Sequence, residues 1–150
     1  MSVSYYQIMY SESNGHFEKA SDSKSTPIYK LNSLAQGDYF KKFVKVKYGY
    51  ELYNFASDGN LIEEAELPPL STEYLKPEGI LEDLKIYKKL LEDIESEMEN
   101  PKDELLAKEI SWWSLNNDRI QYIETEIVEL EKICHYAKEK GYFMKYACDY

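Results

Sequence analysis

Apolar side chains in the second half of the chain recur at the spacing of two helices that pack against each other. The first series is separated by 4, 3, 4, 3 and 4 residues: Ile80, Leu84, Tyr87, Leu91, Ile94 and Met98. This heptad spacing, whose positions we call the seam, is typical of a coiled coil. In "MENPKDE", Asn100 is then expected as the N-cap and Pro101 as the first residue of a second helix. So short a connection predicts an antiparallel helical hairpin over residues 78–140.

The second series continues the seam but changes phase in its middle. It runs through Leu106, Ile110, Trp113, Asn117, Ile120, Ile123, Ile127, Leu130, Cys134 and Ala137. The two short steps around Ile120 predict a stammer, or a break of the helix near Asn116. A continuous second helix would be longer than the first, so residues 123–140 would pack on the sheet or on another chain. A buried Asn117 would fix the register of such a pair. We therefore expect a homodimer, with Gly141 ending the helix.

Residues 1–67, before the helices, have the composition of strands and turns. The segment "VSYYQIMY" (3–10) is β-branched and aromatic, and "SNGH" supplies an Asn-Gly turn. Residues 38–67 predict three further strands, which the two following prolines end. Residues 141–150 predict either a tail or a final strand. The predicted fold class is therefore α+β, a single domain in which a small antiparallel β-meander precedes the helical hairpin.

The chain is strongly acidic, with a formal net charge of -10 from 28 acidic and 18 basic side chains. Such a charge repels nucleic acid and anionic lipid and steers the protein toward basic surfaces. Arg119 is the only arginine, which disfavours bidentate recognition of phosphate or guanine. The two cysteines show no pairing pattern, and the first residues hold neither a basic region nor an apolar run. We expect a cytoplasmic protein that does not enter a membrane.

The sequence holds no motif for catalysis, for a cofactor or for a metal. Its six glycines form no phosphate-binding loop. Cys134 and His135 are adjacent, and neighbouring side chains on a helix point about 100° apart, so they are not placed to act as nucleophile and base. Cys134 also lies on the seam, which predicts a small buried side chain. We therefore expect a protein that is not an enzyme and needs no cofactor and no metal.

The strongest candidate for a binding site is an acidic run at the tip of the hairpin. The run "LEDIESEMENPKDE" (91–104) carries the carboxylates Glu92, Asp93, Glu95, Glu97, Glu99, Asp103 and Glu104. Trp112 follows on the second helix, one position off the seam. Either both tryptophans fill the junction of helices and sheet, or Trp112 is an exposed anchor for a partner. The acidic run itself fits either a binding surface or a solvated helix face.

A basic stretch, "KKFVKVKYGY" (41–50), offers an alternative site. In an extended strand one face would carry Lys41, Phe43, Lys45 and Lys47. Lysines around an aromatic ring would suit single-stranded nucleic acid. The same lysines would also protect a sheet edge from aggregation, or face the acidic helices of the same fold.

In its general character, short, acidic, without a catalytic motif and with 15 tyrosines, the chain resembles the small inhibitors that bacteriophages direct against host nucleases, including anti-CRISPR proteins. The resemblance shares no motif and assigns no residue. It implies a non-catalytic inhibitor that binds the basic surface of a nucleic-acid-handling host protein. Two alternatives stay open: a nucleic-acid-binding module that uses the lysine stretch, and a self-assembling structural or adaptor protein. The inhibitor and the nucleic-acid-binding module differ in which charged surface is exposed after folding. An inhibitor needs the acidic run to be exposed, and a nucleic-acid-binding module needs the lysine stretch to be exposed.

Overall fold

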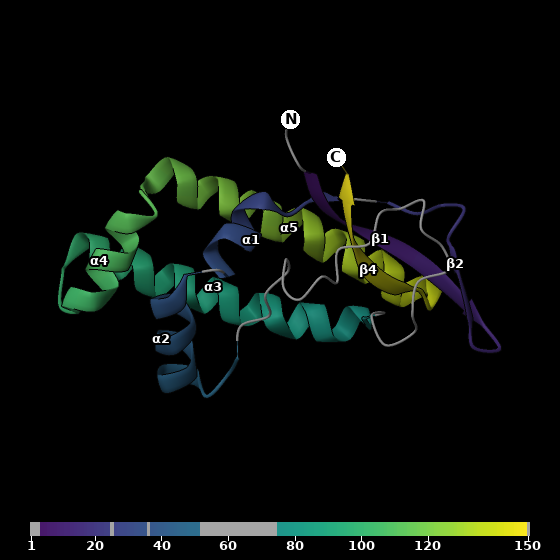
Figure 1. The fold of residues 1–150 in the computed structure, drawn as a ribbon, viewed down its shortest axis with the longest axis horizontal. Coiled ribbons are helices and arrows are strands. Elements are labelled where there is room, and N and C mark those ends of the chain that lie inside the picture. The colour runs from purple at the N-terminus through teal and green to yellow at the C-terminus, as the bar shows by residue number, and fades with distance from the viewer. Residues whose placement is uncertain (1–3, 25, 36, 52–74, 150) are drawn as a thin grey trace.

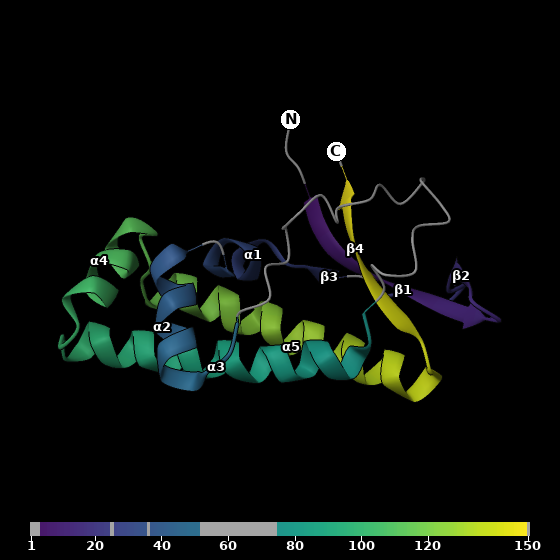
Figure 2. The same cartoon turned by 60° about the horizontal axis from the view of Figure 1, so that its bottom comes forward.

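Two long antiparallel helices, α3 (Pro77–Glu99) and α5 (Asn117–Lys140), form the axis of the protein (Figure 1, Figure 2). The computed structural model describes residues 4–24, 26–35, 37–51 and 75–149. The seam is confirmed on α3, where its first five side chains are buried: Ile80, Leu84, Tyr87, Leu91 and Ile94. The predicted α+β class with a helical hairpin is therefore confirmed.

A short helix, α4 (Glu104–Trp112), lies at the tip of the hairpin, between α3 and α5. The chain leaves the helical conformation after α4, and Ser114 has a left-handed φ of 52°. The Asn116 side chain then accepts a hydrogen bond from the backbone N–H of Arg119 at 2.9 Å, which caps α5. The predicted break near Asn116 is confirmed.

This break removes the excess length that the sequence indicated. The helices α3 and α5 have 23 and 24 residues, so each spans about 35 Å at roughly 1.5 Å per residue. Residues 123–140 lie along α3 and against α1 and the sheet. Asn117 is exposed in the first turn of α5, so its predicted role in fixing the register was wrong. The homodimer stays a prediction and no longer has the support of an unpaired helix.

The connection between α3 and α4 differs from the predicted one. Asn100 is the C-cap of α3, not the N-cap of the next helix, and its N–H donates to the carbonyl of Ser96 at 2.9 Å. A residue before proline avoids the helical conformation, so Pro101 ends α3 at Asn100, and the N–H groups of Lys102 and Asp103 then bind Glu97 before α4 begins. Asp103 is the N-cap instead, and its carboxylate accepts from the N–H groups of Leu105 and Leu106 at 3.1 Å.

Four strands in the described part of the chain form one antiparallel sheet: β1 (Ser4–Ser13), β2 (His16–Lys19), β3 (Thr26–Pro27) and β4 (Phe143–Asp149). Strand β1 is central, because Tyr10 pairs with Lys19 of β2 and with Phe143 of β4. The predicted Asn-Gly turn is confirmed, since Asn14 and Gly15 have φ values of 54° and 81°. The final strand predicted as one possibility for residues 141–150 is confirmed by β4.

The strand predicted over residues 38–48 was wrong, because this segment forms helix α2 (Asp38–Tyr48). Phe40 and Val44, one helical turn apart, are fully buried against the rest of the core. Gly49 ends the helix in the left-handed conformation with a φ of 65°. The further strands predicted up to residue 67 fall mostly outside the described residues.

One buried cluster contains residues of the sheet and of the helices. Met9 of β1 faces the helices and belongs to this cluster, whereas Ile8 and Tyr10 face the other side of the sheet. There Phe17 and Phe143 pack edge to face, with ring centroids 5.3 Å apart. None of the helices in the described ranges combines the length and the apolar composition that a membrane span requires.

The sequence pattern did not predict helix α1 (Tyr29–Ala35). This helix packs on α5, and the carboxylate of Glu126 on α5 binds its first turn. Glu126 accepts hydrogen bonds at 3.0 Å from the N–H groups of Lys30 and Leu31 in the first turn of α1. These donors have no partner within their own helix, and a negative charge is favourable at a helix N-terminus. Glu126 therefore fixes where α1 lies on α5.

Candidate protein-binding surface

Two of the seven carboxylates of the acidic run stabilise the fold of the tip. Glu97 is only 7% exposed, and its Oε1 accepts from the backbone N–H of Lys102 at 2.7 Å and of Asp103 at 2.6 Å. Asp103, besides capping α4, accepts from the hydroxyl of Tyr39 at 3.0 Å. Burial, followed by this hydrogen bond, raises the pKa of Tyr39. These carboxylates satisfy donors of the tip itself.

Asp93 connects α3 to α2. Its carboxylate accepts from Nζ of Lys47 at 2.6 Å and from the hydroxyl of Tyr48. The hydrogen bond to Asp93 raises the pKa of Lys47, because it stabilises the charged ammonium. The acidic face of α3 and the basic face of α2 thus partly neutralise each other.

The four other carboxylates of the run are exposed: Glu92, Glu95, Glu99 and Glu104. Glu95 lies across the α3–α5 contact from Glu124, with which it shares a hydrogen bond. Burial, then this contact with Glu124, raises the pKa of Glu95. Both carboxyls line a groove of about 260 Å³ whose apolar wall includes Ile127 and Val128. Repulsion between carboxylates is therefore built into the surface between α3 and α5.

We expect Glu124→Gln to stabilise the protein at neutral pH. The raised pKa of Glu95 means that its protonation favours the folded state, so this stability is present at low pH and is lost as pH rises through the raised value. A neutral residue at position 124 removes the repulsion. Screened like-charge neighbours on helices cost roughly 0.2–0.5 kcal/mol, so the gain should be of that size.

Thermal unfolding at several pH values measures this effect. The gain of Glu124→Gln should be present at pH 7 and should vanish in acid, where protonation of Glu95 removes the repulsion in the parent protein as well. Glu92→Gln, on the same helix as Glu95 but with a weaker effect on it, should give a smaller gain. A loss of stability at pH 7 would contradict the repulsion.

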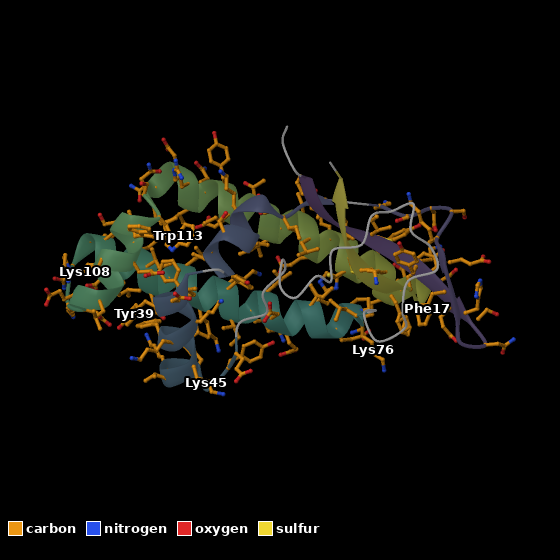
Figure 3. The ribbon with its side chains drawn as sticks, in the orientation of Figure 1. Phe17, Tyr39, Lys45, Lys76, Lys108 and Trp113 are labelled. Carbon is orange, nitrogen blue, oxygen red and sulfur yellow. The ribbon has the colours of Figure 1, made fainter. Side chains whose placement is uncertain are left out.

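The outer side of α4 carries two large apolar side chains in line. Trp112 is 79% exposed and Leu105 is 54% exposed. They are seven residues apart, which places them on one side of the helix, about 10 Å apart along its axis. Lys108 lies between them on the same side, and Figure 3 shows it on the outer side of α4, at the end of the protein away from the sheet.

Trp113 has the opposite role from its neighbour. It packs against the core, and its indole N–H donates to Oε1 of Glu109 at 3.0 Å. Of the two possibilities for the tryptophans, the structure shows an exposed Trp112, and the prediction that both fill the junction was wrong for this residue. Leu105 was missed, although an apolar residue seven positions before Trp112 and equally off the seam was a usable signal.

The alternative site on the lysine stretch does not have the geometry of a strand face. Because α2 is a helix, its side chains turn by about 100° per residue, and Lys41, Phe43, Lys45 and Lys47 no longer share one face. Phe43 packs against the core, with its ring centroid 6.3 Å from that of Tyr39. Lys45 pairs with Glu51 at 3.3 Å, and Lys47 pairs with Asp93. Two of the three lysines are thus already matched by carboxylates.

The cysteine and histidine of α5 are arranged as the sequence predicted. Cys134 is fully buried, and burial raises the pKa of its thiol to about 12, whereas His135 is exposed. The Sγ atom of Cys134 lies 3.6 Å from Sδ of Met144 on β4. Within the ranges that the structure describes, no three histidine, cysteine, aspartate or glutamate side chains are grouped as metal ligands.

Comparisons with protein families, with curated proteins and with solved structures gave no match for this chain.

Proposed function

We propose that this protein acts by binding another protein through the tip of its helical hairpin. The surface consists of Leu105, Lys108 and Trp112 on α4, together with the exposed carboxylates Glu104 at the start of α4 and Glu99 at the end of α3, and we call it the tip surface. The observation that carries the proposal is the 79% exposure of Trp112 in line with Leu105. Single exposed apolar residues are common, but tryptophan is enriched among interface anchors, and here it lies in line with a second exposed apolar side chain.

The partner should carry positive charge around an apolar pocket. Glu104 directly precedes Leu105 in the chain, Glu99 ends α3, and the whole chain has a net charge of -10, so a basic surface would be attracted at long range. Proteins that bind nucleic acid present such surfaces to phosphate groups. A chain bound there would block access of nucleic acid, so the proposed activity is inhibition by occupation. Lys108 lies within the tip surface and favours a carboxylate or backbone carbonyl of the partner at that point.

We expect Trp112→Ala to weaken binding by about 30-fold, because an anchor that is desolvated on binding contributes about 2 kcal/mol or more. The measurement is capture on immobilised protein from nuclease-treated lysate, with the bound proteins identified and competed with heparin. Tyr122→Ala is the matched control, since Tyr122 is 63% exposed on α5, outside the tip surface. Basic proteins lost with Trp112→Ala, retained with Tyr122→Ala and displaced by heparin would support the proposal.

The charges of the tip surface should act on the rate of association. Glu99→Lys with Glu104→Lys should slow association with the captured partner, and the difference from the parent should shrink as salt rises, because exposed charges are screened within about 8 to 10 Å. Equal capture by Trp112→Ala and the parent protein would contradict the anchor. Capture that depends on intact nucleic acid would instead favour the nucleic-acid-binding alternative.

A further inference from the structure

A pocket of about 270 Å³ lies between α1, the turn after α4 and the start of α5. Its apolar lining includes Leu34 from α1, Trp113 and Leu115 from the turn, and Ile123 from α5. Leu34 and Ile123 belong to the buried core, so the floor of the pocket is part of the fold. Figure 3 shows Trp113 on the side of α4 that faces α1, away from the tip surface.

The walls of this pocket are fixed before any ligand binds. The indole of Trp113 is held by its hydrogen bond to Glu109 and by Gly37, where a Cβ would lie 3.0 Å from the indole nitrogen. Helix α1 is held on α5 by the three hydrogen bonds that Glu126 accepts. A preformed apolar cavity with few polar groups is the usual form of a small-molecule site.

The charged side chains that line the pocket, among the residues described, are Lys30 and Arg119. The pocket lining therefore contains two cations and no carboxylate, although the chain as a whole has 28 acidic residues and a negative net charge. Two carboxylates lie near the pocket but do not line it: Glu126 accepts from backbone N–H groups of α1 and attracts Lys30 from outside the pocket, and Glu109 accepts from the indole N–H of Trp113. The arginine is the only one in the chain, and its planar fork suits a carboxylate, sulfonate or phosphate.

We infer that this pocket binds a small amphipathic anion, a molecule with one acidic group and an aromatic or branched apolar body. The acidic group would lie at Lys30 and Arg119, and the body would contact Trp113 and the aliphatic floor. The pocket volume is near the lower end of the range for ligand pockets, about 300–1,000 Å³. The apolar body of the ligand should therefore be about the size of one ring, and a dinucleotide or a lipid would be too large. This site is separate from the tip surface and does not depend on the proposed function.

The probe that tests this inference is 4-tert-butylbenzoate, and its matched control is the neutral amide of the same shape. Titration followed by calorimetry should give one site with a Kd of about 1 mM or tighter, the value expected for a ligand of about 13 non-hydrogen atoms. The amide should bind at least about tenfold more weakly, because it lacks the charge that the two cations recognise. In NMR spectra the indole N–H signal of Trp113 should shift, while that of exposed Trp112 serves as an internal reference.

Variants of the exposed cations test the site without disturbing the core. Arg119→Gln and Lys30→Gln should each weaken binding of the acid about tenfold and leave binding of the amide unchanged. Lys108→Gln, on the outer side of α4, should change neither. Equal affinity for acid and amide, full affinity in Arg119→Gln, or no saturable binding at millimolar concentration would overturn the inference.

Discussion

Replacing Glu97 by lysine should unfold the tip of the hairpin and lower the free energy of unfolding by about 3 kcal/mol or more. Glu97 is 7% exposed, and its Oε1 accepts from two backbone N–H groups, those of Lys102 and Asp103. Lysine offers no acceptor, so both donors would be left unsatisfied next to a buried ammonium. For a chain of this size the midpoint Tm should fall by about 6 to 12 °C.

Thermal unfolding followed by circular dichroism checks this result against two further variants. Glu99→Lys makes the same charge reversal two residues later on an exposed side chain, and its Tm should stay within about 2 °C of the parent. Glu97→Gln keeps an acceptor oxygen and should be intermediate. If Glu97→Lys and Glu99→Lys melted alike, Glu97 would be only one charge among many on a solvated face.

Gly37→Ala should be the second costly substitution. A Cβ at this position would lie 2.5 Å from Cδ2 of Phe40, 2.7 Å from Oε1 of Glu109 and 3.0 Å from Nε1 of Trp113. Phe40 is fully buried, so its ring has no free space into which to move. The φ of Gly37 is -69°, which alanine adopts readily, so the cost is steric alone. Overpacking of this kind costs roughly 1–3 kcal/mol, and a Tm lower by about 4 to 8 °C is expected for a loss near 2 kcal/mol.

Gly79→Ala is the matched control for this steric argument. A Cβ at Gly79 has nothing within 4 Å, and the residue lies in the first turn of α3. Alanine there should raise stability by at most about 0.5–1 kcal/mol, the difference between the two residues in a helix interior. In Gly37→Ala the indole N–H signal of Trp113 should also shift, because the Glu109 hydrogen bond must move. Equal Tm changes in the two variants would show that Gly37 is not close packed.

The helical hairpin was predictable because its signal is local and periodic. The seam of α3 recurs over almost three heptads, and helix-breaking residues around Asn116 mark the end of α4. Segment 38–48 was not predictable in the same way. Its apolar residues Phe40, Phe43, Val44 and Val46 fit a strand and a helix equally well, and contacts with α3 and α4 decide the outcome. Those contacts are distant in sequence.

The candidate site was predictable in part, for similar reasons. Acidity of the tip follows from composition, but the sequence does not separate exposed Glu99 from buried Glu97, because the donors that Glu97 satisfies belong to the turn that Pro101 reshapes. The place of Trp112 off the seam left open whether it fills the junction or is exposed, and only the structure shows it exposed. The pocket at Arg119 joins three segments, so no single stretch of sequence indicates it.

Site-specific photo-crosslinking tests the tip surface most directly. Trp112 or Leu105 is replaced by p-benzoylphenylalanine, and Tyr122, whose 63% exposure lies between those of the two, is replaced in the same way as a control on α5. After irradiation in the cells that make the protein, we predict that positions 112 and 105 crosslink the same basic protein, and that position 122 does not. No partner at positions 112 and 105, or the same protein at equal yield from position 122, would contradict binding through the tip surface.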